Sequence, residues 1–277
     1  MNQPVITHVK RDAEPFNMDR RHYHNQFEIY YLLKGERNYF ISQRSYHVQK
    51  GDLVLINKNI LHKTSTINRD QPAHERILIQ FDENLFSSLS AEMKAADLFK
   101  VFEKKENILS LNPKQQLWLE EELFKLIAEA QKEKNAENLL YLKLIIAQIL
   151  IFIKRISAES AAQNLDYPDQ KHKNISQIAA YISQNYKKSL TLSSLADKFN
   201  YSPAYLSRAF KEVTGFNFVE YKNNVRIKEA GKLLQQSKLS VTEIATEVGF
   251  NNITHFGRIF KEITDLSPLA YRKVKDL

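Results

Sequence analysis

The feature that most constrains this chain is a ten-residue pattern that occurs twice near its end, 50 positions apart. Tyr205–Thr214 reads YLSRAFKEVT and His255–Thr264 reads HFGRIFKEIT, so that five of the ten positions are identical. Further matches lie on either side, which pair Leu195-Ala196 with Ile244-Ala245 and Tyr221 with Tyr271. The repeat predicts two copies of one supersecondary unit in this part of the chain.

Each copy has the signals of a helix-turn-helix unit. In the first, Thr191 can cap a short helix that ends at Phe199, and Ser202 can cap a second helix with Pro203 at its first position. In the second copy, Ser240 and Glu243 have the spacing of a capping box. An apolar stripe follows in each longer helix, formed by Leu206, Phe210 and Val213 in one and by Phe256, Phe260 and Ile263 in the other.

Between the two units we expect one long helix over Phe218–Gln236. Two recognition helices that enter successive major grooves on one DNA face must lie ~34 Å apart. A rigid helix can hold that separation. Three basic residues on it are candidates for contacts with the DNA backbone, and solvent exposure is the alternative: Arg226, Lys228 and Lys232.

The opposite face of each longer helix combines small side chains with Arg and Lys. These residues are Ala204, Ser207, Arg208 and Lys211 in the first copy, and Thr254, Gly257, Arg258 and Lys261 in the second. Small side chains let a helix enter a major groove, Arg can pair with guanine, and Lys meets phosphate. Arg208 and Arg258 could instead be ordinary exposed charges, but their matched positions favour double-stranded DNA as the partner.

Charge and composition agree with this interpretation. Residues 174–277 carry a net charge of +6 out of +8 for the whole chain, which fits a polyanionic partner, although a solvated basic face is the alternative. The chain has no cysteine, which excludes disulfides, thiolate metal sites and a cysteine nucleophile. We see neither a secretory signal nor an apolar stretch of ~20 residues, and therefore expect a cytoplasmic protein without a membrane partner.

The N-terminal half begins with short runs rich in Ile, Tyr, Phe, Leu and Val, separated by turn signals such as Lys34-Gly35. These runs predict strands at Glu28–Leu33, Asn38–Ile41, Tyr46–Gln49, Leu53–Ile56 and Arg76–Phe81. Short, closely spaced strands are typical of a barrel or a sandwich. We therefore expect an α+β protein in which residues 1–85 form a β-barrel.

Residues 86–156 are expected to be a helical segment for packing and dimerisation. Leu139, Leu142, Ile146, Ile149, Ile153 and Ile156 follow an a/d heptad pattern, and a second apolar edge is formed by Leu140, Leu144 and Ile151. One edge can pack on the barrel and the other on a second copy of the chain, which predicts a homodimer; an internal helix pair is the alternative. The polar residues 157–173 are expected to be a linker to an all-α domain over 174–277.

The C-terminal domain resembles the DNA-binding domain of AraC/XylS transcription regulators. The motifs that carry the resemblance are Leu195-Ala196, Tyr201-Ser202, Leu206–Lys211, Gly215, Arg226, Ala230, Leu233-Leu234, Ile244-Ala245, Gly249-Phe250, Phe256, Arg258–Lys261, Ser267-Pro268 and Tyr271-Arg272. The resemblance implies base contacts from Ala204, Ser207, Arg208, Ile253, Thr254, Gly257 and Arg258. This chain departs from the family at Asp265, where glycine is common, and at Gly257, where Ser or Thr is usual.

The N-terminal half resembles a cupin barrel, the usual sensor of such regulators. His22, His24 and Glu28 have the spacing of the first cupin motif, and the segment from Gly51 to His62 has that of the second. On a strand, His22, His24 and Glu28 share one face because their separations are even. We favour an effector pocket lined by His22, His24, Glu28 and His62. The same four residues are the candidate ligands if the barrel binds Mn, Fe, Ni or Zn, although we predict neither a metal nor another cofactor.

The preferred hypothesis is a sequence-specific transcription regulator that is not an enzyme. A small-molecule effector, with carbohydrate as the favoured class, would bind the barrel. Through the Leu139–Ile156 helix and the linker, it would change how the two helix-turn-helix units are presented to DNA. The resemblance favours an activator that recruits RNA polymerase. The alternatives are a metal-dependent cupin enzyme and a constitutive DNA binder whose barrel only dimerises.

Overall fold

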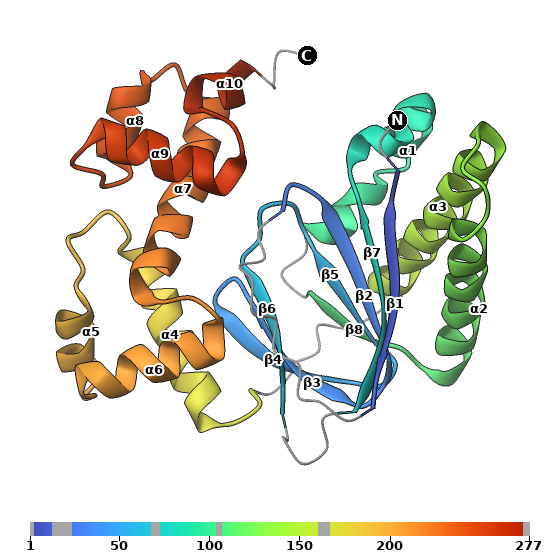
Figure 1. Cartoon of the computed structure of the whole chain (residues 1–277), viewed down its shortest axis with the longest axis horizontal. Helices are drawn as coiled ribbons and strands as arrows, with labels where there is room; N and C mark the ends of the chain where they lie inside the picture. Colours follow the sequence, from blue (N-terminus) through green and yellow to red (C-terminus); the bar gives the residue numbers. More distant parts are fainter. Residues whose placement is uncertain (1–2, 13–23, 68–72, 104–106, 160–166, 274–277) are drawn as a thin grey trace.

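The N-terminal part of the computed structural model contains two antiparallel sheets that face each other across a shared interior (Figure 1). The structure describes residues 3–12, 24–67, 73–103, 107–159 and 167–273. One sheet has the order β1-β7-β2-β5-β8 and the other the order β4-β3-β6. The strands are β1 (Val5–Arg11), β2 (Phe27–Lys34), β3 (Glu36–Ile41), β4 (Arg44–Gln49), β5 (Asp52–Ile56), β6 (His62–Thr66), β7 (His74–Phe81) and β8 (Ile108–Ser110).

Alternation along the strands divides their side chains between two cores. On β2, Tyr30 and Leu32 point into the space between the sheets, where they pack with residues of β3, β4 and β5. Ile29 and Tyr31 point to the outer face of the five-stranded sheet. Because both faces are covered, the strand is buried on either side, and the period-2 contrast between polar and apolar residues is weak.

Helices cover the outer face of the five-stranded sheet. They are η1 (Glu83–Leu89), α1 (Ser90–Ala95), η2 (Leu98–Phe102), α2 (Pro113–Ala130) and α3 (Ala136–Glu159). Every residue of the predicted heptad seam, from Leu139 to Ile156, is buried in this core. The second edge of α3 remains exposed at Leu140, Leu144 and Ile151. The seam is therefore an internal contact, and only the second edge is open to another molecule.

The C-terminal part is all helical. Its helices are α4 (Gln170–Gln184), α5 (Leu192–Lys198), α6 (Pro203–Thr214), α7 (Phe218–Gln236), α8 (Val241–Glu247), α9 (Ile253–Thr264) and α10 (Pro268–Lys273). Helices α5 and α6 form one helix-turn-helix unit, α8 and α9 form the other, and α7 joins them as predicted. None of the described helices is long and apolar enough to cross a membrane.

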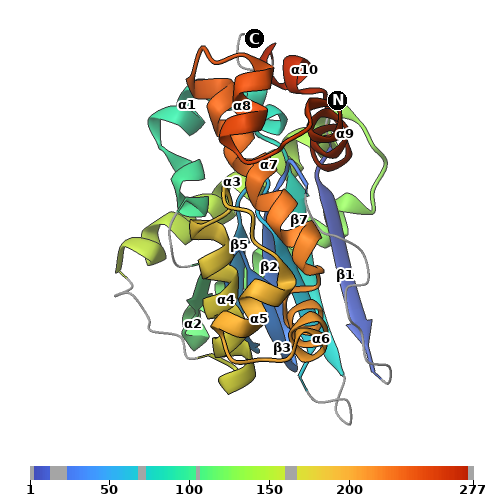
Figure 2. The ribbon, with the colours of Figure 1, turned by 90° about the vertical axis from the view of Figure 1, so that its left-hand side faces the viewer.

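The two parts of the chain share an apolar core. Phe40 of β3 and Leu61, directly before β6, belong to the same buried cluster as residues of α4, α6 and α7. Figure 2 shows these helices in front of the sheets. Hydrogen bonds join the same surfaces: Ser45 N donates to Ser176 Oγ at 3.1 Å, and Tyr221 Oη donates to Ser42 O at 2.7 Å. The first helix-turn-helix unit is therefore seated on the outer face of the three-stranded sheet.

The expected fold class is confirmed, but three strands were not predicted. Residues 86–156 were expected to be helical, and this is wrong at β8, a three-residue strand that pairs with β5. Such a strand is too short to show a period of two. The strand β6 was missed because its alternate residues are His and Thr instead of apolar ones. The strand β1 lies at the edge of the sheet, where it pairs with β7, and most of its exposed side chains are polar.

Candidate functional site

The two recognition helices begin and end in similar ways. Ser202 Oγ accepts from Tyr205 N at 3.3 Å at the start of α6, and Asn252 Oδ1 accepts from His255 N at 2.8 Å at the start of α9. Both helices end at a residue in the left-handed region, which is Gly215 in one and Asp265 in the other. The buried stripes Leu206–Val213 and Phe256–Phe260 then fix which face of each helix points outward.

The candidate DNA-contacting residues lie on that outward face. Ala204, Ser207, Arg208, Lys211, Ile253, Thr254, Arg258 and Lys261 are exposed, and Gly257 is half-exposed. A Cβ atom added to Gly257 would meet nothing within 4 Å, so its surroundings leave room for close approach of a partner. Arg258 Nη1 lies 3.6 Å from Glu262 Oε2. The sensor covers the other side of the first unit, and the recognition face of α6 therefore stays open.

Of the three basic residues considered on α7, Arg226 is the one that is buried and makes contacts within the domain. Arg226 is buried, its Nε donates to Tyr186 O at 2.8 Å, and its guanidinium lies over the ring of Phe250. It thereby joins the segment after α4 to the second helix-turn-helix unit. This arginine is held inside the domain and is not available to DNA, unlike the exposed arginines of α6 and α9.

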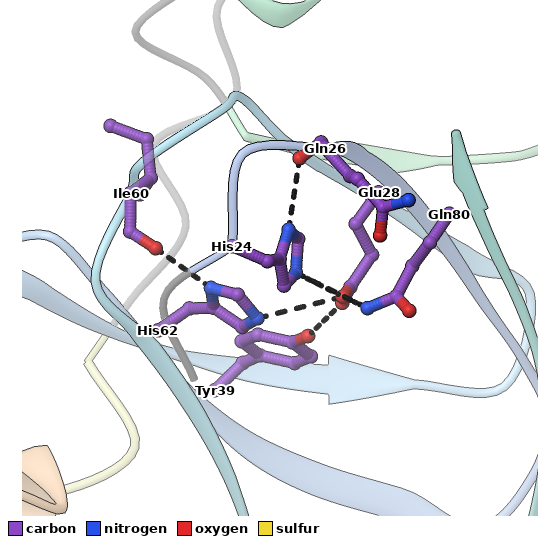
Figure 3. A network of polar contacts seen from close by, with 7 residues as sticks. All are labelled: His24, Gln26, Glu28, Tyr39, Ile60, His62 and Gln80. Carbon is purple, nitrogen blue, oxygen red and sulfur yellow. Dashed lines mark hydrogen bonds and ion pairs between the residues drawn. The ribbon is translucent and has the colours of Figure 1, made fainter. Parts of the chain in front are cut away.

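The candidate effector site is a polar network in the interior of the N-terminal part (Figure 3). Glu28 lies at its centre and is buried. Its Oε2 is 3.1 Å from His24 Nε2 and 3.5 Å from His62 Nε2. Two residues not predicted from the sequence complete the network: Tyr39 Oη donates to Glu28 Oε1 at 2.9 Å, and Gln80 Nε2 donates to Glu28 Oε2 at 2.9 Å.

Strand register explains why these residues meet. Glu28 is the direct partner of Gln80 across β2 and β7, and His62 is the partner of Ile41 across β6 and β3. Tyr39 is two positions from Ile41 and therefore shares its face. The sequence carried one usable signal for Gln80, since His74, Arg76 and Gln80 alternate with Ile77, Ile79 and Phe81 along β7.

Electrostatics within the network favour a charged pair. Burial alone would raise the pKa of Glu28, but His62 and His24 outweigh it and hold that pKa well below the ordinary value of 4.5. Burial would lower the pKa of His62, but the Glu28 carboxylate reverses this and raises it above 6.5. His62 Nδ1 donates to Ile60 O at 2.8 Å, so a proton on Nε2 makes this side chain an imidazolium that faces Glu28.

Of the four predicted sensor residues, the structure brings together His24, Glu28 and His62. His22 lies outside the described residues. Ligand atoms of these three residues all lie within 4.8 Å of one another. Two imidazoles and a carboxylate suit Mn, Fe, Ni or Zn, and equally can hydrogen-bond a hydroxylated organic molecule.

Known protein families match both halves of the chain. The AraC-like ligand binding domain family matches residues 3–140, and the helix-turn-helix domain family matches residues 195–274. An uncharacterized regulator of the helix-turn-helix type from Bacillus subtilis, YisR, is 24% identical over 257 residues, which is 90% of this chain and 86% of the relative.

Two further relatives have more specific names. The melibiose operon regulatory protein of Escherichia coli is 24% identical and covers 94% of this chain and 85% of its own length. The transcriptional activator RhaS of Citrobacter koseri is 31% identical over 134 residues, which are 48% of this chain and 46% of the relative. With a ligand-binding half and a double helix-turn-helix half both matched, the chain belongs to the AraC family of transcription regulators.

Proposed function

We propose that this protein activates transcription by binding specific DNA sites through α6 and α9, under the control of a small molecule bound between its two sheets. The observation that carries the proposal is the matched, exposed placement of Arg208 with Lys211 and of Arg258 with Lys261. Arg at a base edge supplies specificity, and Lys at phosphate supplies affinity. We assign no catalytic residue.

The test is genome-wide DNA occupancy of the tagged protein in its host. We expect discrete sites that disappear in the Arg208→Ala/Arg258→Ala variant. Arg155→Ala is the matched control, because Arg155 is an exposed arginine of α3, far from α6 and α9 along the chain. The proposal is contradicted if the wild-type protein, well expressed under varied growth conditions, shows no discrete sites, or if the double variant keeps them.

The effector would contact His24, Glu28 and His62. These residues offer two imidazoles and a carboxylate to hydroxyl groups, and carbohydrate is the class that we favour. The name of the Escherichia coli relative, a regulator of the melibiose operon, supports a sugar as effector. The name of RhaS, a transcriptional activator, supports activation. We propose RNA polymerase as the protein partner and the cytoplasm as the location.

Two strands provide a route from the effector to the DNA-reading half. On β3, Tyr39 faces Glu28, and its neighbour Phe40 packs in the core of the first helix-turn-helix unit. At β6, His62 faces Glu28, and Leu61 packs in that same core. Neighbouring residues on a strand point to opposite faces. Effector binding would therefore shift α4, α6 and α7 directly, a shorter route than the one through Leu139–Ile156.

Dimerisation would use the exposed edge of α3. Leu140, Tyr141, Leu144 and Ile151 are each at least one-third exposed, and exposed apolar residues that cluster on one surface often mark an interface. We expect Leu144→Glu to give a monomer by light scattering at a concentration at which the wild-type protein is a dimer. Lys143→Gln, also on α3, is the control, because it makes the same change in net charge. A dimer that persists in Leu144→Glu would place the interface elsewhere.

The second candidate function is a metal-dependent cupin enzyme, which the clustering of His24, Glu28 and His62 favours. The wild-type protein would then bind a transition metal stoichiometrically, lose it in His24→Ala, and turn over a small substrate. Metal-free protein that still occupies its DNA sites would reject this function. If the protein is instead a constitutive DNA binder whose barrel only dimerises, its affinity for the promoter would not change with any metabolite tested.

A further inference from the structure

The space between the two sheets contains a second polar cluster, at the end remote from Glu28. Along β7, Gln80 lies opposite Glu28, whereas Arg76 lies opposite Leu32. These two rows are four residues apart, or ~13 Å along the strand. Arg37 lies on the same inner face of β3 as Tyr39, and is paired with Thr66 of β6. Arg11, at the end of β1, is the partner of His74.

Arg37 is fully buried at this remote end. Its Nε donates to Thr64 Oγ1 at 3.1 Å and its Nη1 to Thr66 Oγ1 at 2.8 Å. Burial lowers the pKa of Arg37 to about 10, and the positive charges of Arg76 and Arg11 add to this effect. The guanidinium groups of Arg76 and Arg11 are thus within electrostatic reach of the buried Arg37.

Arg76 is the most informative residue of this cluster, because two of its three guanidinium nitrogens are buried and unused. Its Nε and Nη1 atoms are buried and find no hydrogen-bond partner among the described residues. Its guanidinium carbon lies 5.7 Å from the centre of the Tyr30 ring. The buried hydroxyl of Tyr30, although beside Thr64, makes no hydrogen bond of good geometry with the described residues. The Arg76 guanidinium therefore lies by the ring of Tyr30, and its charge acts on the Tyr30 hydroxyl.

Such an arrangement is unfavourable in the protein alone. Buried N–H groups without acceptors cost free energy, and guanidinium groups gathered in a medium of low dielectric constant repel one another. A carboxylate or a phosphate reduces both costs, because it accepts two parallel hydrogen bonds from the Arg76 guanidinium and its negative charge offsets the charge of that group. A neutral sugar hydroxyl accepts hydrogen bonds but leaves the charges in place.

We propose that the effector of this regulator is an anion, with a carboxylate or phosphate group that binds Arg76 and the Tyr30 hydroxyl in the field of Arg37 and Arg11. This inference rests on the proposed function, since it concerns the effector of that same sensor. The anionic group would lie at the guanidinium end of this interior. A sugar phosphate or a sugar acid has this chemistry.

The experiment measures ligand-induced stabilisation of the full-length protein by thermal unfolding and by titration calorimetry. The probes are matched pairs at constant ionic strength, namely glucose with glucose 6-phosphate and galactose with galacturonate, together with inorganic phosphate. The variants are wild type, Arg76→Gln, Arg76→Lys, and Arg155→Gln, which makes the same charge change at an exposed site on α3.

We expect at least one anionic probe, and not its neutral partner, to raise the melting temperature of wild type and Arg155→Gln in a saturable way. Loss of charge-assisted hydrogen bonds in Arg76→Gln should weaken its binding roughly 10- to 100-fold. Arg76→Lys, which keeps the charge without the planar fork, should bind with intermediate affinity. Without ligand, Arg76→Gln should be at least as stable as wild type, whereas a purely structural arginine would leave it less stable.

Three outcomes would overturn the proposal. Anions could stabilise all variants alike, which would place their binding elsewhere, such as on the DNA-reading face. Anions could fail to bind the wild-type protein at all. A neutral sugar could bind wild type and Arg76→Gln equally, in which case the sensor proposal stands and only the anionic character of the effector is rejected. Retained operator binding by each variant in the absence of ligand shows that its fold is intact.

Discussion

At the level of single residues, Glu28 and His62 form a buried pair whose charges depend on each other. The lowered pKa of Glu28 contributes stability above 4.5 that is lost as the pH falls through its folded-state pKa. The raised pKa of His62 contributes stability below 6.5 that is lost as the pH rises through its folded-state pKa. The pair therefore stabilises the protein most between these two ordinary values.

Glu28→Gln tests this expectation. Removing one partner of a buried pair costs about 3–5 kcal/mol, and the hydrogen bond from Tyr39, which the glutamine oxygen can still accept, should bring the loss to the lower end of that range. The difference in unfolding free energy between wild type and variant should be largest near pH 5–6 and decrease on both sides. Chemical denaturation as a function of pH measures it. A difference that is independent of pH would show that the pair is not charged.

Arg208 and Lys211 should affect DNA binding in different ways. Arg208→Ala should cost about 1–3 kcal/mol on a specific site and relax the preference for one base. Lys211→Ala should weaken binding to all sequences and reduce the slope of log affinity against log salt by about one. Fluorescence anisotropy on the operator and on scrambled DNA separates these effects. Equal loss on both DNAs in Arg208→Ala would identify a phosphate contact instead.

At the level of secondary-structure elements, the two recognition helices differ in the residue that ends them. Gly215 has φ +85° and Asp265 has φ +59°. A Cβ atom on Gly215 would also lie 2.5 Å from Lys63 Cδ, a flexible side chain that can move. The two helix ends thus provide a matched pair, in which one has the residue that the backbone favours and the other does not.

We expect Gly215→Ala to destabilise the protein by about 1–2 kcal/mol, the cost of the left-handed conformation for a residue with a Cβ atom. Asp265→Gly should stabilise it by up to about 1 kcal/mol, since aspartate tolerates this conformation better than alanine does. Thermal unfolding of both variants measures the effects. A loss of stability in Asp265→Gly would mean that the Asp265 side chain makes a contribution larger than its backbone cost.

At the level of the whole molecule, Phe40 lies in the N-terminal part of the chain but packs in the core of the C-terminal part. It lies on β3, yet its ring is buried among residues of α4, α6 and α7, 6.3 Å from the ring of Tyr221. If this shared core couples the two parts, a cavity there should weaken both. Transmission of the effector signal depends on such a coupling.

Phe40→Ala should therefore cost about 3–5 kcal/mol, as for other large buried aromatic residues. In scanning calorimetry, it should lower the unfolding temperature of both parts of the chain. Tyr221→Phe is the milder comparison, because it keeps the ring and removes only the hydroxyl, whose hydrogen bonds to Ser42 O, Ser183 Oγ and Ala179 O contribute about 1 kcal/mol each. A shift confined to the N-terminal part in Phe40→Ala would show that the interface does not couple them.

The sequence alone determined most of the DNA-reading half, although the predicted linker 157–173 is wrong at both ends, since α3 continues to Glu159 and α4 begins at Gln170. Its signals are local: the caps at Thr191, Ser202 and Ser240 lie within a few residues of the amides they bind, and the 3.6-residue period of the buried stripes is set within each helix. The repeat doubled every one of these signals. The bounds of α7, Phe218–Gln236, follow from capping and periodicity in the same way.

Only the tertiary structure decided which polar residues meet between the two sheets and how the N-terminal part contacts the DNA-reading half. Gln80 joins Glu28 from a strand that is 52 residues away in the chain, and Arg37 and Arg76 converge through the register of different strands. The inward-facing residues of β6 include His62 and Thr64, which are polar, so the strand lacks the apolar alternation by which a strand is recognised from sequence. Pairing between distant strands is set by backbone hydrogen bonds and sheet packing, and no short window of sequence records that choice.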